Sequence, residues 1–376
     1  MKSFTFFKFL SKGDKTLFDV PVKNQLAFIN KLGAPRDDLE RSYFQYLSQQ
    51  VFVAGWKKFV LNFCAIFVIP IIIPVLLLKG LFVKHSNNLD AIGEFKGLED
   101  IVPLCLKENY DINNEAWREG FSLRYSDFFC IWPMIWSYQP YFVLKSLLKV
   151  AQYSHSIKLH NPKAFIVHNE YSFTSSLLTA FCERNNLKHI NVMHGEKLLY
   201  IRDSFFRYHE CYVWDKHYVS LFETLKAEPT QFRIAIPPSM SINTQLHINK
   251  SVYADYKYYL ANNTEKEISE ISKKMREIQK KGHSIKVRLH PRYSNIDVIK
   301  NYFTESEIEF PKDVNIVESI SNLEYAIGSY STVLVQAYLA GKKVIMDDIT
   351  LKHQYEKLSS LNYILSQKNN QKLSEI

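Results

Sequence analysis

Cysteine is scarce in this chain, and the motifs of metal-binding and nucleic-acid-binding proteins are missing. Only 5 of the 376 residues are cysteine, and no two of them form a Cys-x-x-Cys pair. That spacing argues against a disulfide framework or a zinc site and is typical of reduced cytosolic thiols. Zinc-finger spacing is absent and the basic residues are dispersed, so we expect no nucleic-acid partner. Because Met1–Lys15 has no long apolar core, we expect no cleavable signal peptide.

The rest of the composition is that of a globular protein with anionic partners. Hydrophobic residues make up 47% of the chain and charged residues 23%, which is ordinary for a protein with a packed core. The length allows two domains. The net charge of +9 favours an anionic membrane surface or phosphorylated substrates.

A long apolar run lies near the N-terminus. Phe59–Leu78 contains no charged residue, and its length matches the ~20 residues that cross a bilayer. Pro70 and Pro74 interrupt it, and each removes a backbone donor. The preceding residues, 1–58, mix polar and apolar residues in a pattern that predicts helices. They carry ten Lys and Arg against five Asp and Glu. If the rest of the chain is cytoplasmic, one crossing would place this basic segment outside, against the positive-inside tendency.

Three arrangements of Phe59–Leu78 therefore remain open. A re-entrant or in-plane helical hairpin, bent at the two prolines, avoids the conflict of charge. A single span and a buried core helix are the alternatives. We expect contact with a membrane, and a monotopic arrangement in preference to a span.

Parallel βαβ units are predicted from residue 162 onward. Apolar runs predict strands at 164–168, 189–194 and 212–214, with a helix over 172–186. A second series predicts helices at 265–281, 296–303 and 332–340 and strands at 232–236, 256–260, 284–289, 315–317, 324–327 and 343–346. We thus expect two Rossmann-like α/β domains, 86–228 and 229–376, after an N-terminal helical, membrane-associating region, 1–85.

Polar residues follow the predicted strands, where ligands of open α/β sheets bind. In the second domain Arg288, His290, Pro291 and Arg292 end one strand. An imidazole and two guanidinium groups can bond a phosphate. The next such end carries four small residues that precede a helix, Gly328, Ser329, Ser331 and Thr332. Its hydroxyl and N–H groups suit an anion. A chance His-Pro on an edge strand and an ordinary N-cap are the alternatives.

In the first domain the strand ends carry histidine and glutamate. His194 and Glu196 flank a glycine, and Glu170 follows the preceding strand. An imidazole with a pKa near ~6.5 can accept the proton of a hydroxyl. Glu196, Glu170 or Asp203 could orient His194, or one of them could itself be the base. The alternative is a buried structural histidine.

These motifs resemble those of GT-B glycosyltransferases that build bacterial cell-surface polymers. His290-Pro291 and Ser331-Thr332 are similar to the His-Pro and Ser-Ser/Thr motifs of bacterial sialyl- and Kdo-transferases, which bind the donor nucleotide and phosphate. His194-Gly195 is similar to the His-Gly motif of CDP-glycerol glycerophosphotransferases, whose histidine is held to be the base. The acidic catalytic string of sialyl-type enzymes is absent, which leaves the base open.

The resemblance implies a metal-independent transferase without a cofactor. Its donor would be a nucleotide-activated sugar or polyol, with a cytidine nucleotide favoured. Its acceptor would be a growing polysaccharide, such as capsule or O-antigen, or a lipid-linked saccharide. It would act at the cytoplasmic face of the bacterial inner membrane, attached through Phe59–Leu78. A nucleotide-sugar epimerase of GT-B-like fold and a non-catalytic, membrane-bound assembly scaffold are the alternatives.

Overall fold

The chain forms two compact units in a computed structural model that describes all residues except 1–9, 11, 12 and 369. The start of the helical region expected over 1–58 thus lies outside the described residues. The first unit ends at Pro237 and excludes the short segment Gly195–Leu198, which groups with the second unit. The second unit continues from Pro238 to Ile376.

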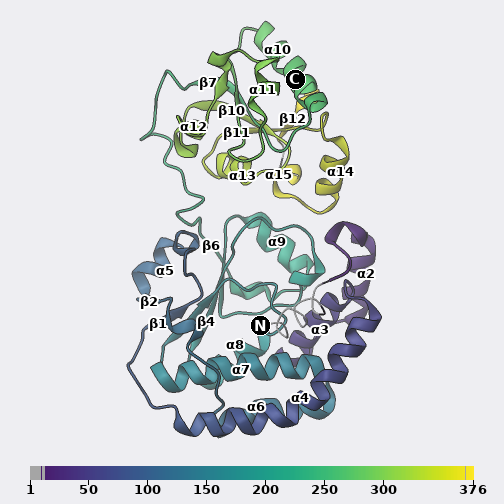
Figure 1. Cartoon of the computed structure of the whole chain (residues 1–376), viewed down its shortest axis with the longest axis vertical. Coiled ribbons are helices and arrows are strands. Elements are labelled where there is room, and N and C mark those ends of the chain that lie inside the picture. The colour runs from purple at the N-terminus through teal and green to yellow at the C-terminus, as the bar shows by residue number, and fades with distance from the viewer. Residues whose placement is uncertain (1–9, 11–12, 369) are drawn as a thin grey trace. The chain divides into compact units, whose positions relative to one another are not determined.

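The first unit is built on a parallel six-stranded sheet (Figure 1). Its strands are β1 (Ala91–Gly93), β2 (Ile112–Asn113), β3 (Ala164–Val167), β4 (Lys188–Val192), β5 (Glu210–Val213) and β6 (Phe232–Ile234), in the order β2-β1-β3-β4-β5-β6. The strands expected at 164–168, 189–194 and 212–214 are confirmed. The strand expected at 232–236 was assigned to the second domain, and this is wrong. It pairs with β5 through Tyr212 and Arg233, so the division falls after residue 237 instead of at 228.

Helices cover this sheet, and α7 (Pro140–His160) is the central one. The ring of Tyr153 in α7 lies 4.3 Å from that of Phe165 in β3. The other α-helices are α2 (Val22–Leu32), α3 (Asp38–Gln50), α4 (Gly55–Phe82), α5 (Leu104–Asn109), α6 (Tyr125–Ser137), α8 (Ser175–Arg184) and α9 (Lys216–Thr224). Helix α3 packs on α8, and Ser42 Oγ accepts a hydrogen bond of 2.8 Å from the N–H of Leu177. The N-terminal helices therefore belong to the first unit.

The apolar run forms part of one continuous helix, α4, and not a helical hairpin. Gly55–Phe82 runs unbroken through Pro70 and Pro74. Both prolines lie on an exposed side of the helix, whereas the opposite side packs on α7. Packing on that side holds the helix together although each proline removes one backbone hydrogen bond. Among the described residues α4 alone is long and apolar enough to cross a membrane, and 22% of its most apolar window is buried.

The second unit contains a second parallel six-stranded sheet. Its strands are β7 (Ala254–Tyr259), β8 (Ile285–Arg288), β9 (Ile308–Glu309), β10 (Leu323–Gly328), β11 (Lys343–Met346) and β12 (Gln371–Lys372). Their order, β12-β11-β10-β7-β8-β9, is that of a Rossmann sheet, in which the strand order reverses between β7 and β10. The strand expected at 315–317 is wrong. Asn315 caps helix α12 (Ile316–Ser321) by accepting from the N–H of Glu318.

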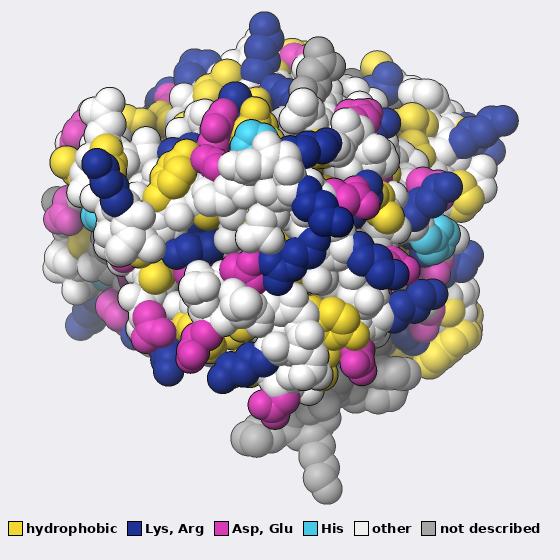
Figure 2. Space-filling model, turned by 90° about the horizontal axis from the view of Figure 1, so that it is seen from above, with side chains coloured by type: hydrophobic (Ala, Val, Ile, Leu, Met, Phe, Trp, Pro, Cys, Tyr) yellow, Lys and Arg dark blue, Asp and Glu magenta, His cyan; other side chains and the backbone are white. Residues whose placement is uncertain are grey.

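The core of the second unit lies between the sheet and α10 (Glu265–Lys280). Ile271 and Met275 of α10 are buried in one cluster with Val287 and Ile308. The remaining α-helices are α11 (Ile296–Lys300), α13 (Thr332–Leu339), α14 (Lys352–Ser360) and α15 (Ile364–Gln367). Short 3-10 helices occur at η1 (Leu17–Asp19), η2 (Glu99–Ile101), η3 (Ala116–Arg118), η4 (Ile201–Asp203), η5 (Pro229–Gln231), η6 (Glu305–Glu307) and η7 (Leu373–Glu375). On the face in Figure 2, Lys and Arg are interspersed with Asp and Glu. The two expected Rossmann-like α/β domains are confirmed.

Candidate active-site residues at the strand ends

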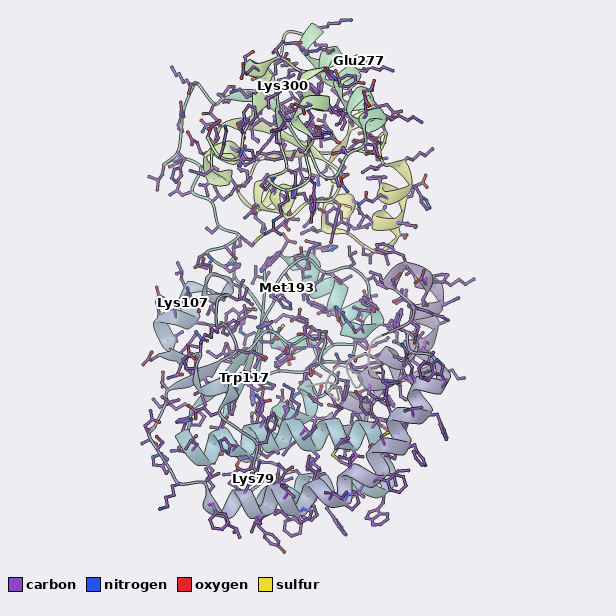
Figure 3. All side chains as sticks on the ribbon, in the orientation of Figure 1. Lys79, Lys107, Trp117, Met193, Glu277 and Lys300 are labelled. Atoms are coloured by element: carbon purple, nitrogen blue, oxygen red, sulfur yellow. The ribbon has the colours of Figure 1, made fainter. Side chains whose placement is uncertain are left out.

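His194 lies at the carboxyl edge of the first sheet, directly after Met193, which Figure 3 labels. Its Nδ1 lies 3.5 Å from Oε1 of Glu170, which follows β3. The carboxylate is fully buried (0% exposed), and the imidazole is 33% exposed. A carboxylate at this position favours a proton on Nδ1, which leaves Nε2 as the nitrogen that can accept a proton. This separation is longer than an ordinary hydrogen bond.

The loop that carries Glu170 is held by helix α3. Gln45 Nε2 donates to the carbonyl of Glu170 at 2.9 Å, and Gln49 Nε2 donates to the carbonyl of Tyr171 at 2.6 Å. On the other side Asn191 Nδ2 donates to Oε2 of Glu170 at 3.3 Å. Helix α3 therefore holds the backbone of the loop, and Asn191 bonds the carboxylate itself. Sequence reasoning missed Gln45 and Gln49, because an amide in a helix gives no local signal of what it binds.

Three more polar residues stand at the same edge. The ring of His168 lies 4.6 Å from that of His194, edge to face. Asn169 donates to the side chain of Glu94, which follows β1. In a sheet of this order the strands β1 and β3 flank the reversal point, where such folds bind ligands. Glu94 was missed because β1 has only three residues and leaves almost no periodic pattern.

The other two acidic candidates are placed differently. Glu196 lies in the segment that groups with the second unit. Gly195 before it has φ +78°, a conformation that favours glycine. Asp203 is buried, and its Oδ1 lies 3.0 Å from Nε of Arg202. The carboxylate of Glu170 lies beside the imidazole of His194.

In the second unit, His290 presents a hydrogen-bond donor at the end of β8. Its Nδ1 accepts from the N–H of Arg292 at 3.1 Å, so the neutral ring carries its proton on Nε2. The ring stacks on Tyr293 with centroids 4.5 Å apart. Together with Pro291, Ser294 and others it lines a pocket of about 510 Å³. The geometry thus frees Nε2–H to donate to a ligand.

Arg288 is engaged inside the unit. Its Nη1 lies 2.6 Å from Oε1 of Glu309, and both side chains are buried. The other oxygen of Glu309 lies 2.7 Å from Nζ of Lys257, whose pKa burial lowers to about 8 against the opposing effect of Glu309. Arg288 therefore ties β8 to β9. Its guanidinium lies in this buried cluster with Glu309.

Helix α13 offers an N-terminus that suits an anion. Ser331 is its N-cap and accepts from the N–H of Val333 at 3.2 Å, and the first turn holds no acidic residue. At the N-terminus of α10, by contrast, a capping box between Thr264 and Glu267 engages backbone N–H groups of the first turn. Gly328 ends β10, and a Cβ there would lie 3.3 Å from the carbonyl oxygen of Tyr259 in β7. The backbone therefore comes close at the reversal point, where α13 has the anion-favouring N-terminus.

Neither unit shows a metal centre in its described part. No group of three or more His, Cys, Asp or Glu is placed there to hold a metal ion.

Ser329 is nearly buried and Thr332 is exposed. The structure thus brings together His194 with Glu170, and Gly328 with Ser329, Ser331 and Thr332.

Comparisons with known proteins give structural neighbours only. No family model and no curated protein matches the chain. The wall teichoic acid polymerase TagF, soaked with CDPG, is 10% identical over 84% of each chain, with a TM-score of 0.39. Another TagF structure is 12% identical with a TM-score of 0.34, and the match covers 58% of this chain and 61% of that chain, less than two thirds of the polymerase. Methanocaldococcus jannaschii UDP-GlcNAc 2-epimerase, bound to UDP-GlcNAc and UDP, is 13% identical over 69% of this chain and 83% of the epimerase, with a TM-score of 0.35. Values at this level define neither a family nor an activity.

Proposed function

We propose that this chain is a transferase that moves a sugar or a polyol phosphate from a nucleotide-activated donor to an acceptor hydroxyl. The observation that carries the proposal is the His194–Glu170 pair, an imidazole beside a buried carboxylate at the carboxyl edge of a parallel sheet. The favoured leaving group is a cytidine nucleotide, as the sequence resemblance implies. The acceptor is a growing cell-surface polysaccharide or a lipid-linked saccharide at the cytoplasmic face of the membrane.

In the first half of the proposed reaction His194 acts as the general base. Nε2 takes the proton of the acceptor hydroxyl while that oxygen forms a bond to the anomeric carbon or the phosphorus of the donor. The buried charge of Glu170 stabilises the imidazolium that results. Asn191 bonds this carboxylate, and Gln45 holds the backbone carbonyl of Glu170.

In the second half the bond to the nucleotide phosphate breaks, and the phosphate leaves with the electron pair. Three groups of the second unit stabilise the charge of this phosphate. They are Nε2–H of His290, the exposed guanidinium of Arg292, and the N-terminus of α13 with Ser331 and Thr332. Pro291 stiffens the loop. Arg288 is a positioning residue, because its guanidinium is held by Glu309 inside the unit. The scheme uses no metal and no cofactor.

Transfer measured with a panel of nucleotide-activated donors tests this function. Purified protein is incubated with each donor and an oligosaccharide or lipid-linked acceptor, and the products are detected by mass. We expect His194→Ala to lower transfer on the order of 10³-fold while nucleotide affinity stays unchanged. His283→Ala, at an exposed histidine of the second unit, is the matched control. Near-parental turnover of His194→Ala would contradict the assignment of the base.

The same panel separates the two alternative functions. An epimerase would convert a UDP-sugar without any acceptor. A scaffold would bind no nucleotide and release no product. Acceptor-dependent release of CMP or CDP supports the transferase alone.

A further inference from the structure

Helix α4 carries a row of exposed apolar side chains along its outer side. Phe59 is 71% exposed and Leu78 is 58% exposed. Members of the row recur every three or four residues, which places them on one helical face: Phe59, Phe63, Phe67, Ile71, Val75 and Leu78. Such a continuous apolar face on a protein surface marks a contact with a partner or a membrane.

Helix α6 carries a second row, made mostly of large aromatic residues. Trp136 is 77% exposed, and the row recurs at steps of four, three and four residues through Tyr125, Phe129, Trp132 and Trp136. The one charged residue in α6 is Asp127, which is buried and lies 2.6 Å from Nε of Arg124. Tryptophan and tyrosine prefer the interface between hydrocarbon and water.

The two rows form one surface. A groove of about 480 Å³ lies between the helices and is lined by apolar side chains that include Ile66, Pro70 and Pro74 of α4 and Phe128, Trp132 and Trp136 of α6. Both helices pack on α7, and Figure 1 shows them along the side of α7 away from the sheet. We call this surface the α4–α6 face.

Helix α4 is attached to the first unit along its length. Asn62 Oδ1 accepts from the N–H of Tyr141 at 3.1 Å, and the carbonyl of Leu76 accepts from the N–H of Leu123 at 3.0 Å. Near the C-terminal end, Lys158 donates to the carbonyl of Gly80. A membrane-crossing α4 would lose these bonds and uncover its buried stripe, which includes Leu61, Ala65 and Ile69. The attachment therefore favours a helix that lies in the plane of the membrane.

Basic residues border the apolar row. Lys79 and Lys84 are exposed beyond Leu78, and Figure 3 labels Lys79 on α4. Lys58 precedes the row and is partly exposed. Lysines at the edge of an apolar face attract anionic headgroups while the apolar side chains enter the acyl region.

We propose that the α4–α6 face inserts into one leaflet of an anionic phospholipid bilayer, with both helices in the membrane plane and the aromatic row of α6 forming part of the anchor. A bilayer is the occupant that the edge lysines, the aromatic row and the apolar groove fit together. The proposal does not depend on the transferase function.

Vesicle binding of the full-length chain tests the contribution of α6. The vesicles are phosphatidylcholine with phosphatidylglycerol, and binding is measured by co-sedimentation. Removing two exposed aromatic side chains in Phe129→Ser plus Trp136→Ser lowers partitioning by about tenfold or more. Phe129→Leu plus Trp136→Phe retains most of the binding. The matched control, Leu246→Ser plus Ile248→Ser, removes two exposed apolar side chains of the second unit and leaves partitioning unchanged.

Labelling of cysteines at the two ends of α4 tests the in-plane arrangement. A Cβ at Gly55 meets no atom within 4 Å, and Lys84 is exposed, so Gly55→Cys and Lys84→Cys are sterically tolerated. In sealed inside-out and right-side-out membranes, a membrane-impermeant maleimide labels both positions from the same side, relative to the parent chain. Labelling from opposite sides would overturn the in-plane helix. Unchanged vesicle binding of the α6 double variant, with its thermal unfolding intact, would overturn the role of α6.

Discussion

Replacing Glu170 with glutamine removes the charge that faces His194 and little else. The carboxylate is fully buried, and Oε1 lies 3.5 Å from Nδ1 of the imidazole. Glutamine keeps the size of the side chain and an oxygen that can accept from Nδ2 of Asn191. Any loss of activity then reports the lost negative charge and the lost preference for one tautomer of His194.

The size of the effect follows from the distance and the exposure. At an effective dielectric constant of ~20, unit charges 3.5 Å apart interact by about 5 kcal/mol. The imidazole of His194 is 33% exposed, so solvent screening reduces this to about 2–3 kcal/mol in the transition state. Since each 1.36 kcal/mol changes a rate tenfold, we expect kcat to fall on the order of 100-fold.

Steady-state transfer kinetics of Glu170→Gln across a range of pH provide the assay. The donor KM should change little, and the acidic limb of log kcat should move to lower pH because the imidazolium loses its carboxylate. Glu183→Gln is the matched control, since Glu183 lies at the same 3.5 Å from a nitrogen of His209 outside the site. If Glu170→Gln keeps kcat within about threefold of the parent, the charge has no catalytic role.

Three further variants test the second unit. Ser331→Ala should raise the donor KM and lower the free energy of unfolding by about 0.5–2 kcal/mol through loss of the α13 cap; an unchanged KM places the phosphate elsewhere. Glu309→Gln leaves Lys257 and Arg288 buried without their counter-charge, so urea unfolding should show a loss of about 3–5 kcal/mol; a neutral change would contradict the buried cluster. Lys257 has a folded pKa of about 8, below its unfolded value of ~10.4. At pH values between these two pKa values the unfolded state binds more protons, so the free energy of unfolding rises with pH in the parent. That rise should be absent in Lys257→Met, and its persistence there would refute the lowered pKa of Lys257.

The strands of the two sheets were largely predictable because their local pattern is strong. Buried parallel strands are continuous apolar runs bounded by polar turns, as in Ala164–Val167 and Lys343–Met346. The strands that were missed are very short, such as β9 with two residues. Strand β6 was found, but its sheet was not, because pairing with β5 is a long-range contact that the local sequence does not encode.

Two errors have a local physical cause. Asn315-Ile316-Val317 has the β-branched residues of a strand, yet the side chain of Asn315 caps a helix. Pro70 and Pro74 predicted a bend in α4, and tertiary packing on α7 overrides that preference.

The candidate site was predictable in its strand-end residues but not in their partners. His194 and Glu170 follow neighbouring strands, so the fold class itself brings them to one edge. The burial of Arg288 against Glu309 was not visible, because Glu309 belongs to the missed strand β9. The supporting amide of Gln45 comes from a helix about 125 residues away in the sequence.

Calorimetric titration of CMP and CDP into the parent protein and its His194→Ala and His290→Ala variants tests the central claim most directly. We propose that the donor binds to the second unit and that the base belongs to the first. The parent and His194→Ala should therefore bind cytidine nucleotides equally well. His290→Ala should bind them about tenfold more weakly, since it loses one donor to a charged phosphate. Equal binding by all three proteins, or no binding of a cytidine nucleotide by the parent, would contradict the account.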